Sequence, residues 1–182
     1  MKTSIIPLIV CFLLTGELNG QAKDVQTDSV EVITEFRNLY RYQNYFLGGQ
    51  PTYEMLQWLK SQGVTKIIKL RTERENSEFT TGSFNETAVA GQMGFTYSLF
   101  PVDGRKDYSP GKLEEFSRLV SGEDIIFIHC ASAGRVTNFF MGYLIKSKGN
   151  SVDEAVAIGK KLAFYLALED LLDVEIHMEA GK

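Results

Sequence analysis

Short apolar runs alternate along the chain with longer segments in which apolar residues recur every three or four positions. Residues 65–70, 95–100 and 125–128 are rich in β-branched and aromatic side chains, which is typical of strands. Helical spacing recurs in the segments 52–62, 86–93, 112–120, 136–147, 152–162 and 167–178. Strands that alternate with helices predict an α/β fold, in which a central, mostly parallel sheet is flanked by helices.

Outside these segments the pattern is less regular. Residues 39–42 and 45–47 predict two short strands joined by a turn at 43–44. We also expect a short helix over 29–36. Residues 72–84 are charged, rich in Ser and Thr and without periodicity, which predicts a loop.

The N-terminal residues have the pattern of a secretory signal peptide. Lys2 precedes an apolar run from Ile5 to Leu14, and small and polar residues follow. This run is shorter than the ~20 residues that a membrane-spanning helix needs. We therefore expect residues 1–22 to be cleaved, which would leave a single domain, 23–182, in the periplasm or secreted and without a membrane anchor.

The composition narrows the function. A hydrophobic content of 44% and a charged content of 23% are ordinary for a globular protein. The formal net charge of -4 argues against a nucleic-acid partner or a polybasic membrane patch. Because His129 and His177 are the only histidines and stand far apart, we expect no metal site. We expect no cofactor either. The oligomeric state does not follow from the composition.

Signal-peptide cleavage would leave a single thiol. The chain has two cysteines, and Cys11 lies within the predicted signal peptide, so Cys130 would have no disulfide partner. A buried, inert cysteine does not need a glycine and an arginine four and five residues later, as in Gly134 and Arg135. These neighbours indicate a functional thiol.

Cys130 lies in a stretch that can bind an oxyanion. Residues 129–137 read His-Cys-Ala-Ser-Ala-Gly-Arg-Val-Thr and stand between a predicted strand and a predicted helix. The turn's N–H groups and the positive end of the helix dipole converge there, which favours a thiolate. Arg71 and Asp103 also follow predicted strands, so the carboxyl edge of a parallel sheet would bring them close to Cys130.

This arrangement suits a phosphate ester. Cys130 would attack phosphorus, and Arg135 would bind two phosphate oxygens with its planar fork. Gly134 can adopt a positive φ angle. The leaving oxygen needs a proton from a carboxylic acid, for which Asp103 and Asp107 are the candidates. The predicted substrate-binding residues are Ala131, Ser132, Ala133, Gly134, Val136 and Arg71, and the predicted loop-ordering residues are His129 and Gln50.

The stretch from His129 to Arg135 resembles the signature loop of the cysteine-dependent tyrosine and dual-specificity phosphatases. It is similar in particular to a bacterial branch related to the phosphatase-like domain of beta-lactamase-hydrolase-like proteins. Other stretches fit that branch in order: Gly49-Gln50-Pro51, residues 63–71, Phe100-Pro101-Val102-Asp103 and Asp153-Glu154-Ala155. The resemblance implies a cysteine-phosphatase, dual-specificity-like fold. It also implies hydrolysis of phosphate monoesters on a phosphorylated protein or a small phosphoester, through a phosphocysteine and with Asp103 as the acid.

One spacing differs from the wider superfamily. Four residues separate Cys130 from Arg135, where most cysteine phosphatases have five, and Val136 takes the place of a Ser or Thr. The same spacing resembles the persulfide loop of single-domain rhodaneses, so sulfur transfer is the alternative enzyme class. A non-catalytic module that binds phosphate or another anion is the other alternative.

Overall fold

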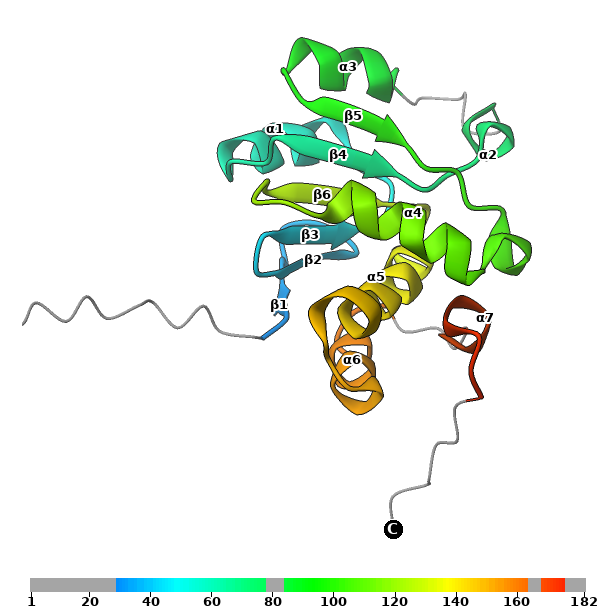
Figure 1. The fold of residues 1–182 in the computed structure, drawn as a ribbon. Helices are drawn as coiled ribbons and strands as arrows, with labels where there is room; N and C mark the ends of the chain where they lie inside the picture. Colours follow the sequence, from blue (N-terminus) through cyan, green and yellow to red (C-terminus); the bar gives the residue numbers. More distant parts are fainter. Residues whose placement is uncertain (1–28, 78–83, 164–167, 176–182) are drawn as a thin grey trace, which may run out of the picture.

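The computed structural model describes residues 29–77, 84–163 and 168–175 of the 182-residue chain (Figure 1). The predicted signal peptide, residues 1–22, lies outside the described residues. Within those three ranges, no helix is both long enough and apolar enough to cross a bilayer.

Six strands in the described part of the chain form one sheet, in the order β1-β2-β3-β6-β4-β5. The strands are β1 (Glu31–Val32), β2 (Leu39–Tyr42), β3 (Tyr45–Gly48), β4 (Lys66–Lys69), β5 (Thr96–Leu99) and β6 (Ile126–His129). β3, β6, β4 and β5 pair in parallel, whereas β1, β2 and β3 pair antiparallel. The predicted α/β fold with a mostly parallel central sheet is confirmed.

Helices cover both faces of the sheet (Figure 1). One face packs against α1 (Tyr53–Ser61) and α3 (Glu86–Gln92). The opposite face carries α4 (Pro110–Val120), α5 (Gly134–Lys148), α6 (Val152–Gly159) and α7 (Leu168–Leu172). Two short elements follow the carboxyl ends of strands, namely α2 (Glu73–Ser77) after β4 and the 3₁₀ turn η1 (Gly104–Asp107) after β5.

α5 is buried along most of its length. Its residues 136–144 are all buried, and α4, α6 and α7 pack around it. A helix that is buried on all sides is apolar all round, which explains why its sequence lacks a polar face. Phe139 meets the rings of Phe100 and Phe116 at centroid distances of 5.7 and 5.4 Å. This packing fixes the N-terminal end of α5, and with it the loop that connects β6 to α5.

The prediction of a helix over 29–36 is wrong. Glu31 and Val32 pair with β2 as the edge strand β1, and the chain then turns so that the N–H of Ile33 reaches the carbonyl of Leu39 at 2.9 Å. Pairing with a neighbouring strand therefore overrides the local helical preference.

Two other local predictions also need correction. Residues 72–84 are not entirely a loop, because α2 begins at Glu73 with Thr72 as its cap. The predicted last helix, 167–178, ends at Leu172. α6 begins with a capping box, since the Ser151 hydroxyl accepts from the Glu154 N–H at 3.2 Å and the Glu154 carboxylate accepts from the Ser151 N–H at 2.8 Å.

Candidate active site

Cys130 follows directly after β6 and lies at the centre of the sheet's carboxyl edge. Its side chain is 2% exposed, and its N–H donates to the carbonyl of Gly48 at 3.2 Å. Ala131 and Ser132 are exposed beyond it, and α5 begins at Gly134. The strand, the small-residue loop and the helix start are therefore arranged as the sequence predicts. We call residues 130–135 the cysteine loop.

The left-handed residue of the cysteine loop is Ala133, not Gly134. Ala133 has φ 71°, whereas Gly134, which could adopt a positive φ, does not do so and is the first residue of α5. A non-glycine residue in this conformation carries a steric cost and needs support from its surroundings. Thr137 supplies part of that support, because its N–H and its hydroxyl both donate to the Ala133 carbonyl, at 2.9 and 3.0 Å.

Val136 contributes no side chain to the cysteine loop. It is fully buried in the core under the sheet, and only its backbone belongs to the first turn of α5. Its predicted contact with substrate is therefore limited to the backbone. The buried Thr137 hydroxyl, already bound to the Ala133 carbonyl, orders this first turn.

The segment between β3 and α1 supports the cysteine loop from the other side. Gly49 and Ser132 form an isolated antiparallel bridge, and the Gln50 N–H donates to the Ala131 carbonyl at 3.2 Å. A Cβ atom on Gly49 would lie 3.1 Å from the Ala131 carbonyl oxygen. The backbone therefore approaches the loop closely, and the predicted loop-ordering role of Gln50 has a geometric basis.

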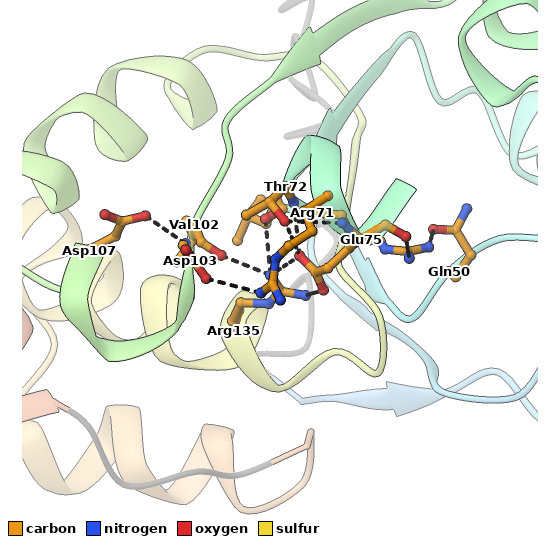
Figure 2. Close-up of polar contacts among 10 residues, drawn as sticks. Gln50, Arg71, Thr72, Glu75, Val102, Asp103, Asp107 and Arg135 are labelled. Carbon is orange, nitrogen blue, oxygen red and sulfur yellow. Dashed lines mark hydrogen bonds and ion pairs between the residues drawn. The ribbon is translucent and has the colours of Figure 1, made fainter. Parts of the chain in front are cut away.

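Arg135 is held by the carboxylate of Glu75 (Figure 2). Its Nη1 donates to Oε2 of Glu75 at 2.8 Å and its Nη2 donates to Oε1 at 2.6 Å. Nη1 also donates to the carbonyls of Val102 at 2.8 Å and Leu70 at 3.4 Å. Burial opposes the charge of Arg135, but Glu75 and the neighbouring Cys130 outweigh it and raise the pKa of the guanidinium. The cation that would bind phosphate is therefore fixed in direction and coupled to the thiol.

The contacts of Arg135 also show that the carboxyl ends of three strands meet at this edge. The carbonyls that it binds belong to Leu70 and Val102, the residues directly before Arg71 and Asp103. The predicted convergence of the β4, β5 and β6 ends is therefore present.

Glu75 was not among the predicted site residues. Thr72 caps α2, and the Glu75 carboxylate accepts from the Thr72 N–H at 2.8 Å and from its hydroxyl at 3.0 Å. These contacts form a capping box, and the sequence signal for it is the Thr72-Glu73-Arg74-Glu75 run. The hydrogen bonds from Arg135 are the main cause that lowers the pKa of Glu75 to about 2. Glu75 is therefore ionised at neutral pH.

Arg71 is buried, with an exposed fraction of 3%, beneath α2. Its Nη1 donates to Oε1 of Gln50 at 2.6 Å and its Nη2 donates to the Glu75 carbonyl at 2.5 Å (Figure 2). These contacts join the β3–α1 segment to α2. A direct contact of Arg71 with substrate stays a prediction.

Asp103 and Asp107 lie together after β5. Asp107 accepts a hydrogen bond from the Asp103 N–H at 2.6 Å (Figure 2), which orients the turn rather than leaving the Asp107 carboxylate free. The Asp103 carboxylate is 40% exposed and pairs with Lys106 and, at 3.7 Å, with Arg74. The contact with Lys106 is the main cause that lowers the pKa of Asp103. Both carboxylates therefore have partners, and the surroundings of Asp103 favour its ionised form.

The side chain of His129 lies on the face of the sheet that α1 and α3 cover, whereas Cys130 packs on the opposite face. Its ring is fully buried and stacks on Phe127, with an interplanar angle of 10° and a centroid distance of 5.1 Å. Its Nε2 lies 2.7 Å from Oε1 of Glu86, although the N–H is not aligned as in a regular hydrogen bond. The expectation that His129 orders the loop instead of reacting agrees with this position. Glu86 was not predicted from the sequence.

Tyr108 and Asn138 form a further wall near the thiol that the sequence did not indicate. The Asn138 amide donates to the Tyr108 hydroxyl at 3.1 Å, and the Tyr108 ring meets Phe139 edge-on at 5.3 Å. Burial is the main cause that raises the pKa of Tyr108, so the phenol stays neutral. No sequence spacing relates the two residues, because they are brought together only by the packing of α5.

A pocket of about 810 Å³ lies on the α1–α3 side of the sheet edge, and none of the residues that line it belongs to the cysteine loop. Gln50, Lys69, Arg71 and Glu86 lie at its polar side, and Tyr53 contributes an aromatic wall. In the described ranges there is no cluster of three or more His, Cys, Asp or Glu that could hold a metal ion.

Residues 25–164 match the model of a family described as "DSP-PTPase phosphatase fused to NAD+ Kinase". No curated protein matches the chain.

Solved structures share the fold at low sequence identity. P. aeruginosa TpbA, solved as a cysteine-to-serine variant in complex with phosphotyrosine, has a TM-score of 0.61 and 14% identity, over 75% of this chain and 80% of that chain. A protein from Shewanella putrefaciens described as a phosphatase has a TM-score of 0.57 and 22% identity, over 75% of this chain and 89% of its own. A protein from Neisseria meningitidis, also described as a phosphatase, has a TM-score of 0.55 and 20% identity, over 69% of this chain and 88% of that chain. The predicted cysteine-phosphatase fold is confirmed.

Proposed function

Because the chain belongs to the phosphatase family described as DSP-PTPase phosphatase fused to NAD+ kinase, we propose that it hydrolyses phosphate monoesters through Cys130. One observation supports this proposal above all. Cys130 and Arg135 stand at the two ends of one short loop, and Arg135 is already oriented by Glu75 at 2.6 and 2.8 Å. Such a preoriented cation next to a thiolate is what stabilises the charge of a transferring phosphoryl group.

The first step is phosphoryl transfer to sulfur. The Cys130 thiolate forms a bond to phosphorus while the bond from phosphorus to the ester oxygen breaks. The loop's N–H groups and Arg135 bind the phosphoryl oxygens. The leaving oxygen takes a proton from Asp103, with Asp107 as the alternative acid.

The second step returns the enzyme to its starting state. Water attacks phosphorus in the phosphocysteine and the bond from phosphorus to sulfur breaks. The Asp103 carboxylate accepts the proton of the water, and inorganic phosphate leaves. We propose a phosphotyrosine-bearing protein or another phosphoester as substrate; the complex of TpbA with phosphotyrosine supports the choice of class.

The reaction class can be tested by assaying the protein and a Cys130→Ser variant with p-nitrophenyl phosphate, and in parallel with thiosulfate plus cyanide. Phosphate release that requires Cys130, without thiocyanate formation, is the expected result. Thiocyanate formation alone would refute the proposal in favour of sulfur transfer. If neither product forms but vanadate raises the melting temperature, the domain is an anion-binding module.

We further propose that this phosphatase domain is exported. The basic start and short apolar run of residues 1–22 support export. Expression in a bacterial host, followed by intact mass measurement, should show loss of the first 20 or so residues from the exported protein. A full-length protein confined to the cytoplasm would contradict export.

A further inference from the structure

A buried carboxylate that the proposed steps do not use lies behind the cysteine loop. Glu86, the first residue of α3, is 6% exposed. Its Oε2 accepts from Gln50 at 2.7 Å and from Lys69 at 3.1 Å. Its Oε1 accepts from the Tyr97 hydroxyl at 2.9 Å and lies 2.7 Å from Nε2 of His129.

These contacts keep the Glu86 carboxylate charged. Burial alone would raise the pKa of Glu86, but His129, Lys69 and Gln50 outweigh it and hold the pKa well below its ordinary value. A charge withdrawn from water is tolerated only with such compensation, so the surrounding donors depend on Glu86 as much as Glu86 depends on them.

Two of these neighbours hold the cysteine loop at separate points. His129 is the residue before Cys130 and the last residue of β6. Gln50 donates its backbone N–H to the Ala131 carbonyl at 3.2 Å. Glu86 therefore restrains the chain on both sides of Cys130 through side chains that come from β6 and from the β3–α1 segment.

The same contacts continue to the far end of the loop. Arg71 donates to Oε1 of Gln50 at 2.6 Å and to the Glu75 carbonyl at 2.5 Å, and Glu75 binds Arg135 (Figure 2). A continuous polar chain thus runs around the loop from one end to the other, in the order His129, Glu86, Gln50, Arg71, Glu75 and Arg135.

We propose that Glu86 is a positioning residue for phosphoester cleavage, which sets the thiol of Cys130 against the guanidinium of Arg135 by tying His129 and Gln50 together from behind the sheet. The proposal rests on the proposed phosphatase function. Glu86 does not touch the substrate and acts only through the residues that it holds.

Glu86→Gln is the informative substitution. An amide keeps one acceptor oxygen but replaces the other with an NH₂ donor. It can therefore serve either the Gln50–Lys69 pair or the Tyr97–His129 pair, but not both. We expect kcat for p-nitrophenyl phosphate to fall by up to about a hundredfold, with a smaller change in KM, because a small displacement of a reacting group is costly.

A second measurement does not require turnover. The rate of iodoacetamide alkylation at Cys130, followed by mass spectrometry of its peptide, reports the thiolate fraction. The rate at about pH 6 relative to about pH 9 should fall in Glu86→Gln, because a displaced thiol interacts less favourably with the charge of Arg135. This ratio is measurable even if the wild-type protein hydrolyses no phosphoester, so failure of the proposed function and failure of the positioning role are distinguishable.

Two further variants complete the test. Tyr45→Phe is the control, because it removes buried hydrogen bonds to Tyr143 and to the Val120 carbonyl on the opposite face of the sheet. It should lower stability and leave the alkylation ratio unchanged. Gln50→Met breaks the chain without removing the buried charge, and should lower the ratio as Glu86→Gln does. An unchanged ratio in a folded Gln50→Met or Glu86→Gln variant overturns the proposal.

Chemical rescue distinguishes positioning from a general structural role. Glu86 lines the pocket of about 810 Å³, so a cavity left by Glu86→Ala opens toward solvent. Formate should restore part of the alkylation ratio in Glu86→Ala and have no effect on the wild-type protein. Absence of rescue in a variant whose melting temperature formate does raise would contradict the positioning role.

Discussion

Glu75 and Arg135 face each other as a two-pronged ion pair, with N–O distances of 2.8 and 2.6 Å. The two side chains are 22% and 14% exposed, so the pair is largely shielded from water. The guanidinium is therefore oriented before any anion arrives, and its direction is set by a residue of a different element.

Replacement of Glu75 should weaken phosphoryl-group binding. In Glu75→Gln one charge-assisted hydrogen bond is lost and Arg135 is held mainly by the Val102 and Leu70 carbonyls, so we expect kcat/KM to fall by about tenfold or more and the affinity for vanadate to fall with it. Glu73→Gln, an exposed position in the same helix, is the matched control and should behave like the wild-type protein. Equal vanadate affinity in both variants would contradict a preorienting role.

Glu75 should also contribute to stability in a defined range of pH. Its pKa is lowered from 4.5 to about 2 in the folded protein, chiefly by Arg135. A depressed pKa stabilises the folded state above the unfolded pKa, and this contribution is lost as the pH falls from 4.5 toward 2. The difference in melting temperature between the wild-type protein and Glu75→Gln should therefore narrow across that range. A difference that stays constant would argue against this linkage.

A substitution at Lys106 can show whether Asp103 or Asp107 is the general acid. Lys106, with help from Arg74, lowers the pKa of Asp103, and a general acid must be protonated to act. Lys106→Met should therefore shift the alkaline limb of the pH–kcat profile to higher pH if Asp103 is the acid. No shift would favour Asp107. Asp103→Asn should slow an alkyl ester more than p-nitrophenyl phosphate, because the poorer leaving group depends more on the proton.

Gly49 should be intolerant of a side chain. A Cβ there would approach the Ala131 carbonyl oxygen to 3.1 Å and the Ser132 Cα to 3.5 Å, both of them backbone atoms of the cysteine loop. We expect Gly49→Ala to cost about 1–3 kcal/mol of stability and to lower vanadate affinity. Gly111→Ala in α4, where a Cβ meets nothing within 4 Å, should instead stabilise the protein by about 0.5–1 kcal/mol. Urea unfolding of both variants tests the contrast.

Local sequence patterns were sufficient for the parts of the site that lie within one segment. The sequence of residues 129–137 was enough to predict the cysteine loop, because the strand end, the turn and the helix start are consecutive there. The shared edge of Cys130, Arg71 and Asp103 followed from the alternation of strands and helices, since parallel strands place their carboxyl ends together. The Ala133 conformation did not follow, because a left-handed alanine is held by Thr137 and by tertiary packing rather than by its own preference.

The part of the site that could not be predicted consists of pairs of residues far apart in the sequence. Glu75 and Arg135 are 60 positions apart, and Gln50 and Glu86 are 36 apart. No periodicity relates such residues, and only the folded sheet brings them into contact. The Thr72–Glu75 capping box was readable, yet it indicates a helix start and not the arginine that Glu75 binds.

η1 is bound to a helix far along the chain, since Arg105 and Asp170 are 65 positions apart in the sequence. Nε and Nη2 of Arg105 both donate to Oδ2 of Asp170, at 2.9 and 2.6 Å, so the turn next to Asp103 is tied to α7. The family match ends at residue 164, before α7 begins. A recombinant fragment cut at the family boundary would keep every reacting group and still lose this anchor, so the last helix is part of the smallest unit that should be expressed for kinetic work.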